Sequence, residues 1–193
     1  EEIINAIQNG TLEEKVIDRN LQEILSITTK TPSFQGYRYN NSPDLDSHAQ
    51  ISKKAATEGM ILLKNDATLP IAQNKSIALF GNFSYDTQAG GSGSGYVHRK
   101  YTIDIAEGLE NAGFTLNKSL VDKYRRHISE EKAQLPAENF WSIPIATEME
   151  VGYNEIQKAA REDDVAIITL GRMSGEGADR TPTKGDYLLS DQE

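Results

Sequence analysis

The sequence predicts an α/β fold, a layered sandwich of helices packed on a largely parallel sheet. Two short apolar runs, residues 76–81 and 165–170, have the length and composition of strands buried on both faces. Stretches with the apolar spacing of helices lie before and between these runs. Alternation of helices with buried strands is typical of domains built on parallel strands.

The first part of the chain predicts two helices. Ile3, Ile4 and Ile7 share one helical face that stops at Gly10, and residues 11–28 carry a second apolar face. Thr11 and Glu14 have the spacing of a capping box, which would open this second helix. We therefore treat residues 1–28 as one helical part.

A change of composition follows. Residues 29–48 are rich in Pro, Asn, Asp, Ser and Gly and show no period, which predicts a linker. Residues 49–193 form the α/β part, with helices expected over 49–60, 103–113 and 153–162. The polar stretch 120–150, with the only tryptophan and two prolines, shows no clear period, and we expect part of it to cross the surface.

Both ends of the chain lie inside expected helices. Residues 1–10 begin within a helix body, and Ser190 and Glu193 have the capping-box spacing that opens a helix at the last residue. We therefore expect an internal segment of a longer polypeptide.

Composition excludes several classes of function. A net charge of −9 with a pI near 4.9 disfavours nucleic acid as a partner, because phosphate binding needs a basic face. No apolar stretch is long enough to cross a bilayer, so no membrane partner is expected. The absence of cysteine excludes disulfides and thiol nucleophiles, and three histidines far apart in sequence do not predict a metal site. The compartment stays open, because acidity suits a bacterial cytoplasmic, periplasmic or secreted protein equally.

Glu176 is the residue of greatest chemical interest. It lies between two glycines, in a loop that follows the apolar run 165–170. Working residues of parallel sheets emerge beyond the carboxyl ends of the strands, and flanking glycines let a ligand approach closely. The local pattern alone would fit an ordinary solvated acid better than a catalytic one, so its interpretation depends on the rest of the chain.

The glycine-rich run at residues 90–95 fits none of the usual phosphate or nucleophile motifs. A phosphate-binding loop needs Gly-Lys followed by Ser or Thr, and a dinucleotide site needs its glycines directly after the strand. A nucleophile elbow fails at both Ser92 and Ser94, since each lacks one of the required glycines. The run is either a flexible surface loop or a backbone-rich loop that approaches a ligand with these two hydroxyls.

Taken in order, these segments resemble glycoside hydrolase family 3, whose members are mostly β-glucosidases. The resemblance rests on the order and spacing of the following segments: residues 55–65, Leu69-Pro70, residues 77–81, residues 90–95, and residues 171–177 with Asp179-Arg180. It implies a catalytic (β/α)8-like barrel joined by a linker to an α/β sandwich, with the active site between them. Residues 1–28 would be the last barrel helices, residues 29–48 the interdomain linker and residues 49–193 the first part of the sandwich.

The same resemblance implies retaining hydrolysis of terminal β-D-glucosyl residues by two carboxylates, without a cofactor. Glu176 would be the acid/base, whereas the nucleophilic aspartate would lie in the barrel, a part of the same polypeptide that this sequence lacks. The segment alone should therefore be inactive. Residues implied to contact a β-glucoside or oligosaccharide substrate are Ser94, Ser92 and Gly93, and residues implied to hold the loop are Arg172, Asp179 and Arg180.

Three alternatives remain open at this point. A β-xylosidase of the same family would show the same motifs. A non-catalytic carbohydrate-binding module could keep the fold without the barrel aspartate. A nucleotide-binding α/β domain is the third alternative, and the failed glycine patterns disfavour it.

Overall fold

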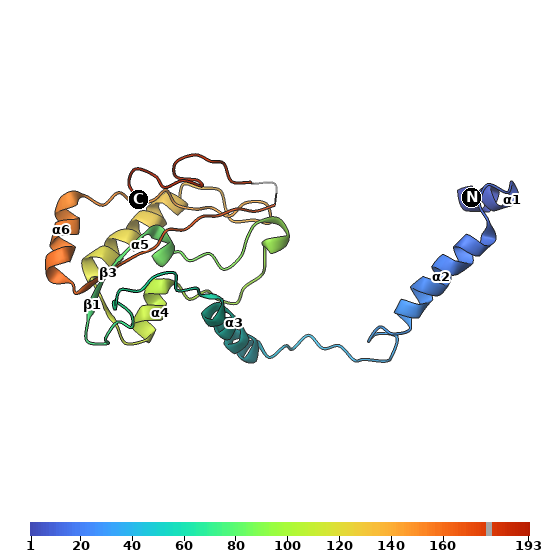
Figure 1. Ribbon diagram of the computed structural model, residues 1–193, viewed down its shortest axis with the longest axis horizontal. Coiled ribbons are helices and arrows are strands. Elements are labelled where there is room, and N and C mark those ends of the chain that lie inside the picture. Colours follow the sequence, from blue (N-terminus) through green and yellow to red (C-terminus); the bar gives the residue numbers. More distant parts are fainter. Residues whose placement is uncertain (177–178) are drawn as a thin grey trace. The chain divides into compact units, whose positions relative to one another are not determined.

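The computed structural model describes residues 1–176 and 179–193 and divides them into two compact units, Glu1–Lys64 and Asn65–Glu193 (Figure 1). The first unit holds three helices, α1 (Glu2–Gln8), α2 (Glu14–Thr28) and α3 (Leu45–Gly59). All of residues 1–64 are described, and none of them is buried. The proposed limits of the barrel helices, the linker and the sandwich stay predictions.

The capping box expected at Thr11 is wrong. Helix α2 begins at Glu14 with Glu13 as its N-cap and without a side-chain cap. The Thr11 hydroxyl instead donates to the Asn9 side chain (2.6 Å) and to the Ala6 carbonyl (3.2 Å), so it closes the end of α1. Helix α3 begins earlier than expected, because the Asp44 carboxylate accepts a hydrogen bond from Ser47 N and caps it.

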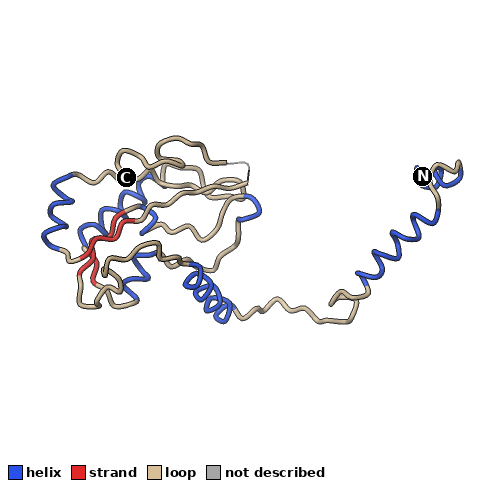
Figure 2. The backbone as a smooth tube through the Cα atoms, viewed as in Figure 1, coloured by secondary structure: helices blue, strands red, loops and turns tan. Residues whose placement is uncertain are grey.

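The second unit is built on a parallel sheet with strand order β2-β1-β3. Its strands are drawn in red in Figure 2. Strand β1 (Ser76–Phe80) is central, and it pairs in parallel with β2 (Thr115–Leu116) and β3 (Val165–Ile168). Two 3-10 turns, η1 (Asn82–Ser84) and η2 (Gly93–Gly95), and helices α4 (Ile105–Asn111), α5 (Lys118–Lys132) and α6 (Tyr153–Glu162) complete the unit. The predicted α/β class with a parallel sheet is confirmed.

Strand β1 is buried on both faces, as its apolar run predicts. Ile77 and Leu79 belong to one core cluster with residues of β2, α4 and α5, and Ala78 belongs to a second cluster with Leu120 and Ala159. The same expectation is wrong for β3, in which half-buried and exposed residues alternate. Ala166 and Ile168 are exposed, and the exposed fraction of Ile168 is 67%.

Helix α5 lies in the stretch that showed no clear period. Its buried side chains, Leu120, Tyr124 and Ile128, are spaced four residues apart, so they form a narrow apolar stripe on an otherwise charged helix. Helix α5 packs on β1 (Figure 1). The Asn117 side chain accepts a hydrogen bond from Leu120 N and caps the helix.

The strand order creates a switch point between β1 and β3. The chain leaves β1 toward β2 on one side, whereas β3 lies on the other side of β1. In open parallel sheets ligands bind beyond the carboxyl ends of two such strands, because their loops diverge there. The glycine-rich loop and the Glu176 loop both begin at this point. Within the described part of the chain, no helix has the length and apolar character needed to cross a membrane.

Candidate active site

The two loops are locked together where they leave the strands. Thr169 N donates to the Phe80 carbonyl (3.0 Å), and the Thr169 hydroxyl lies 2.8 Å from the Ser84 hydroxyl. Gly81, with a φ of 95°, lies so close to Thr169 that a Cβ would be 3.1 Å from its carbonyl carbon and nearer still to its oxygens. A glycine is needed at this position for both its backbone angle and its contact.

Further along, the loops stay side by side through a series of glycine contacts. A Cβ on Gly171 would overlap the ring of Phe83, and one on Gly91 would lie 3.8 Å from the Ser174 carbonyl. A Cβ on Gly175 would be 3.1 Å from Ser92 Cβ and would overlap the hydroxyl. The missing side chains at Gly171 and Gly175 therefore leave room for the side chains of Phe83 and Ser92 from the facing loop.

This packing ends at Glu176. Ser94 N donates a 2.9 Å hydrogen bond to Glu176 Oε2, and Gly93, which is buried, lies against the same side chain. A Cβ on Gly93 would lie 2.6 Å from Glu176 Cβ. Glu176 itself is exposed, and its other carboxylate oxygen has no hydrogen-bond partner among the described residues. One oxygen is thus held by the glycine-rich loop while the other is open to a ligand.

The structure brings Ser92, Gly93 and Ser94 together with Glu176. Ser94 reaches Glu176 through its backbone and is exposed, whereas Ser92 is half-buried against Gly175. Their contact with substrate stays a prediction. Gly177 and Ala178, which follow Glu176 in the motif, lie outside the described residues.

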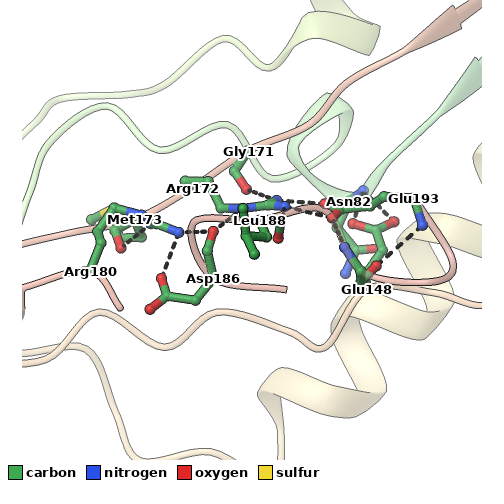
Figure 3. A network of polar contacts seen from close by, with 10 residues as sticks. Asn82, Glu148, Gly171, Arg172, Met173, Arg180, Asp186, Leu188 and Glu193 are labelled. Atoms are coloured by element: carbon green, nitrogen blue, oxygen red, sulfur yellow. Dashed lines mark hydrogen bonds and ion pairs between the residues drawn. The ribbon is translucent and has the colours of Figure 1, made fainter. Parts of the chain in front are cut away.

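The two arginines of the motif form a network at the base of the Glu176 loop (Figure 3). Arg180 donates to the Met173 carbonyl (2.9 Å) and pairs with the Asp186 carboxylate (2.6 Å), while both arginines donate to the Asp186 carbonyl. Arg172 also holds both oxygens of Glu193 at 2.5 Å. The bond from Arg180 to Met173 closes the segment that carries Glu176.

Asp179 behaves differently from the arginines. It is exposed, and the described part of the chain offers it no hydrogen-bond or ion-pair partner. The ion pairs of Arg172 and Arg180 go instead to Glu193 and Asp186, which sequence reasoning did not assign to the site. The capping-box spacing of Ser190 and Glu193 did indicate that the Glu193 side chain is held in place, and both bonds between these residues are present (2.7 and 3.2 Å).

A second missed element lies beneath the loop after β1. The Asn82 side chain is buried and donates to the carbonyls of Ala146 (3.2 Å) and Thr147 (2.8 Å), and it accepts from Met149 N (3.2 Å). Its backbone N–H bonds to the carboxylate of Glu148. Burial raises the pKa of Glu148 above its ordinary value, although the bonds from Asn82 oppose this shift. No local pattern pairs residues so distant in sequence.

The turn after β1 is also held from below by helix α5. Gly81 N donates to the Tyr124 hydroxyl (3.0 Å), and the Tyr124 ring stacks on Tyr85 at 4.9 Å between centroids. Burial raises the pKa of Tyr124 to about 12. This neutral, buried phenol fixes the point from which the glycine-rich loop departs.

The arrangement supports acid–base chemistry on an exposed carboxylate. Among residues 1–176 and 179–193, no group of three or more His, Asp or Glu side chains is placed to bind a metal ion. Glu176 has one oxygen held by a backbone N–H and one open, so it can exchange a proton with a group bound beside the glycine-rich loop.

Comparison with known proteins identifies the family. Residues 60–191 match the model of the glycosyl hydrolase family 3 C-terminal domain. The chain belongs to glycosyl hydrolase family 3. Its resemblance to this family, drawn from the motifs, is therefore confirmed, and the parallel sheet corresponds to the α/β sandwich of the family's C-terminal domain.

Several family 3 proteins are similar over nearly the whole chain. The crystallised β-glucosidase 3B of Thermotoga neapolitana, in complex with α-D-glucose, shares 40% identity with a TM-score of 0.88, covering 99% of this chain and 27% of that protein. Thermostable β-glucosidase B of Acetivibrio thermocellus is 30% identical over 93% of this chain and 22% of its own length. A probable exo-1,4-β-xylosidase of Aspergillus fumigatus is 28% identical over 91% and 21%. The chain thus spans about a quarter of these relatives.

Proposed function

We propose that this chain is the acid/base-bearing part of a retaining β-glucosidase, with Glu176 as the proton donor and acceptor. The observation that carries the proposal is the position of Glu176, an exposed carboxylate held by Ser94 N–H beyond the carboxyl ends of β1 and β3. The nucleophile would be an aspartate of a catalytic barrel in the same polypeptide.

The reaction would proceed in two displacements. Protonated Glu176 gives its proton to the glycosidic oxygen as that bond breaks, while the barrel aspartate forms a bond to the anomeric carbon. The Ser94 N–H stabilises the carboxylate that this step leaves on Glu176. In the second step Glu176 takes a proton from water, which attacks the anomeric carbon and releases the sugar with retained configuration.

The other site residues would serve this carboxylate. We assign the Ser94 and Ser92 hydroxyls and the backbone of Gly93 to substrate binding, and Arg172, Asp179 and Arg180 to holding the loop. For the two arginines, this role agrees with the network around the Asp186 carbonyl. The barrel would supply most of the pocket for the non-reducing sugar.

A β-glucoside is the favoured substrate because the relatives with the highest identities described above are β-glucosidases. The similarity to a probable exo-1,4-β-xylosidase supports a β-xyloside as the second candidate. A non-catalytic carbohydrate-binding module would need the barrel aspartate to be missing.

The test uses the full-length protein with aryl β-glucosides and aryl β-xylosides. We expect a higher kcat/KM for the glucosides, with β-glucose as the first product seen by proton NMR. A preference for the xylosides would select the second candidate. Inverted product would contradict the mechanism, and sugar binding without hydrolysis would indicate the non-catalytic module.

A further inference from the structure

A tight turn at residues 139–142 presents two aromatic side chains next to the glycine-rich loop. Asn139 and Ser142 form an antiparallel bridge with N–H to carbonyl distances of 2.9 and 3.1 Å, and Trp141 N donates to the Asn139 side chain (2.9 Å). Phe140 and Trp141 occupy the tip of this turn. Their rings meet edge to face, 4.7 Å apart at 87°.

The turn is fixed to the same loop that holds Glu176. Gly93 N donates to the Phe140 carbonyl at 2.7 Å, and the rings of Tyr96 and Phe140 meet edge to face at 6.2 Å. Arg99 holds both oxygens of Glu138, at 2.9 and 3.0 Å. Backbone, ring and ion-pair contacts therefore restrain the turn from three points.

Despite this restraint, the aromatic rings face outward. Trp141, the only tryptophan of the chain, is 72% exposed, and Phe140 is 44% exposed. Gly93 connects the two features, because its N–H binds the Phe140 carbonyl and its Cα lies against Glu176. An exposed ring on a turn that bonds to Gly93, next to the residue whose N–H holds Glu176, offers a flat apolar surface to whatever the carboxylate acts on.

We propose that Trp141, supported by Phe140, stacks against a neutral sugar ring on the leaving-group side of the bond that Glu176 protonates. The proposal rests on the function proposed above. A pyranose ring has an apolar C–H face that matches an aromatic plane, and hydroxyls that need both donors and acceptors. The Arg99–Glu138 pair and the Asn139 side chain supply such groups around the turn.

The role of Glu176 as a general acid determines on which side of the glycosidic bond Trp141 would lie. A general acid touches the glycosidic oxygen, and the nucleophile attacks from the opposite face of the glucosyl ring. Groups fixed to the glycine-rich loop, which holds this acid through Ser94 N–H, therefore lie on the side of the leaving group. This mixture of aromatic and polar groups fits a polyol better than a purely apolar partner.

The test compares two β-glucosyl donors in the full-length protein. Cellobiose has a sugar as its leaving group, whereas β-glucosyl fluoride has a single atom that cannot reach Trp141. We expect Trp141→Ala to lower kcat/KM for cellobiose about tenfold and to leave the value for the fluoride unchanged, with partial recovery in Trp141→Phe. Tyr153→Ala on α6 is the matched control, because Tyr153 is also 72% exposed.

Two results would overturn the proposal. Equal losses on both donors would show that the ring supports the fold or packs on another part of the polypeptide, and unchanged values on both would show that it touches no sugar. If the wild type cleaves neither donor, the proposed function fails. Calorimetry with cellobiose, on wild type and Trp141→Ala, then tests the stacking of Trp141 on a sugar independently of hydrolysis. Binding that Trp141→Ala weakens supports the sugar site, and equal or absent binding refutes it.

Discussion

Replacing Gly93 by alanine tests whether the glycine-rich loop sets the position of the Glu176 carboxylate. Gly93 has a φ of 61°, a backbone angle that costs other residues about 1–2 kcal/mol. A Cβ at this position would lie 2.6 Å from Glu176 Cβ and 3.2 Å from its carboxyl carbon, whereas carbon atoms pack best at roughly 3.5–4.0 Å. Glu176 would have to move by about 1 Å to relieve this overlap.

A displacement of that size near a reacting bond costs about 100-fold in rate. We therefore expect Gly93→Ala to lower kcat/KM about 100-fold for an aryl β-glucoside with a poor leaving group, and by less for one with a very good leaving group that needs little protonation. Circular dichroism would show that the variant folds. Gly95→Ala is the matched control in the same turn, because a Cβ there meets nothing within 4 Å. Equal activity of the two variants would refute the reasoning.

Three further predictions concern the supports of the site. Tyr124→Phe should leave Gly81 N without a hydrogen-bond partner and lower the free energy of unfolding in urea by about 1–3 kcal/mol. Because the pKa of Tyr124 is raised from 10.0 to about 12, the stabilisation by this phenol is complete below pH 10 and lost toward pH 12. The stability of the variant should therefore fall less steeply than that of the wild type over this range. Asn82→Ala should lower the melting temperature more than Tyr124→Phe, since it removes three hydrogen bonds of a buried side chain. An equal or smaller change would contradict this role of Asn82. Gly175→Ala should lower the melting temperature through its overlap with Ser92, and Ser92→Gly in the same chain should restore part of it. No recovery would show that this overlap is not the cause.

Strong local patterns predicted much of the fold. The apolar run of β1 and the helical spacing of α6 both gave the element that the structure shows. Helix α5 escaped detection because Leu120, Tyr124 and Ile128 leave most of its surface charged. The capping box predicted at Thr11 was wrong because a threonine hydroxyl can bond to either neighbouring helix, and here it bonds to the end of α1.

The site was predictable only in part. The position of Glu176 after a strand follows from general rules on parallel sheets. Its contact with Ser94 N joins residues 82 positions apart, and the support from Phe140 comes from a third segment, so no local pattern could reveal either. The expected two-sided burial of β3 did not occur, because Ala166 and Ile168 on one of its faces are exposed.

The most direct measurement compares wild type with Glu176→Ala in the full-length protein, on two aryl β-glucosides with a poor and a very good leaving group, with and without azide. If Glu176 is the acid/base, activity should fall severely on the poor leaving group and less in the glycosylation step of the good one. Azide should then restore turnover and yield β-glucosyl azide, because it needs no general base. Equal losses on both substrates, with no azide product, would show that Glu176 only supports the loop.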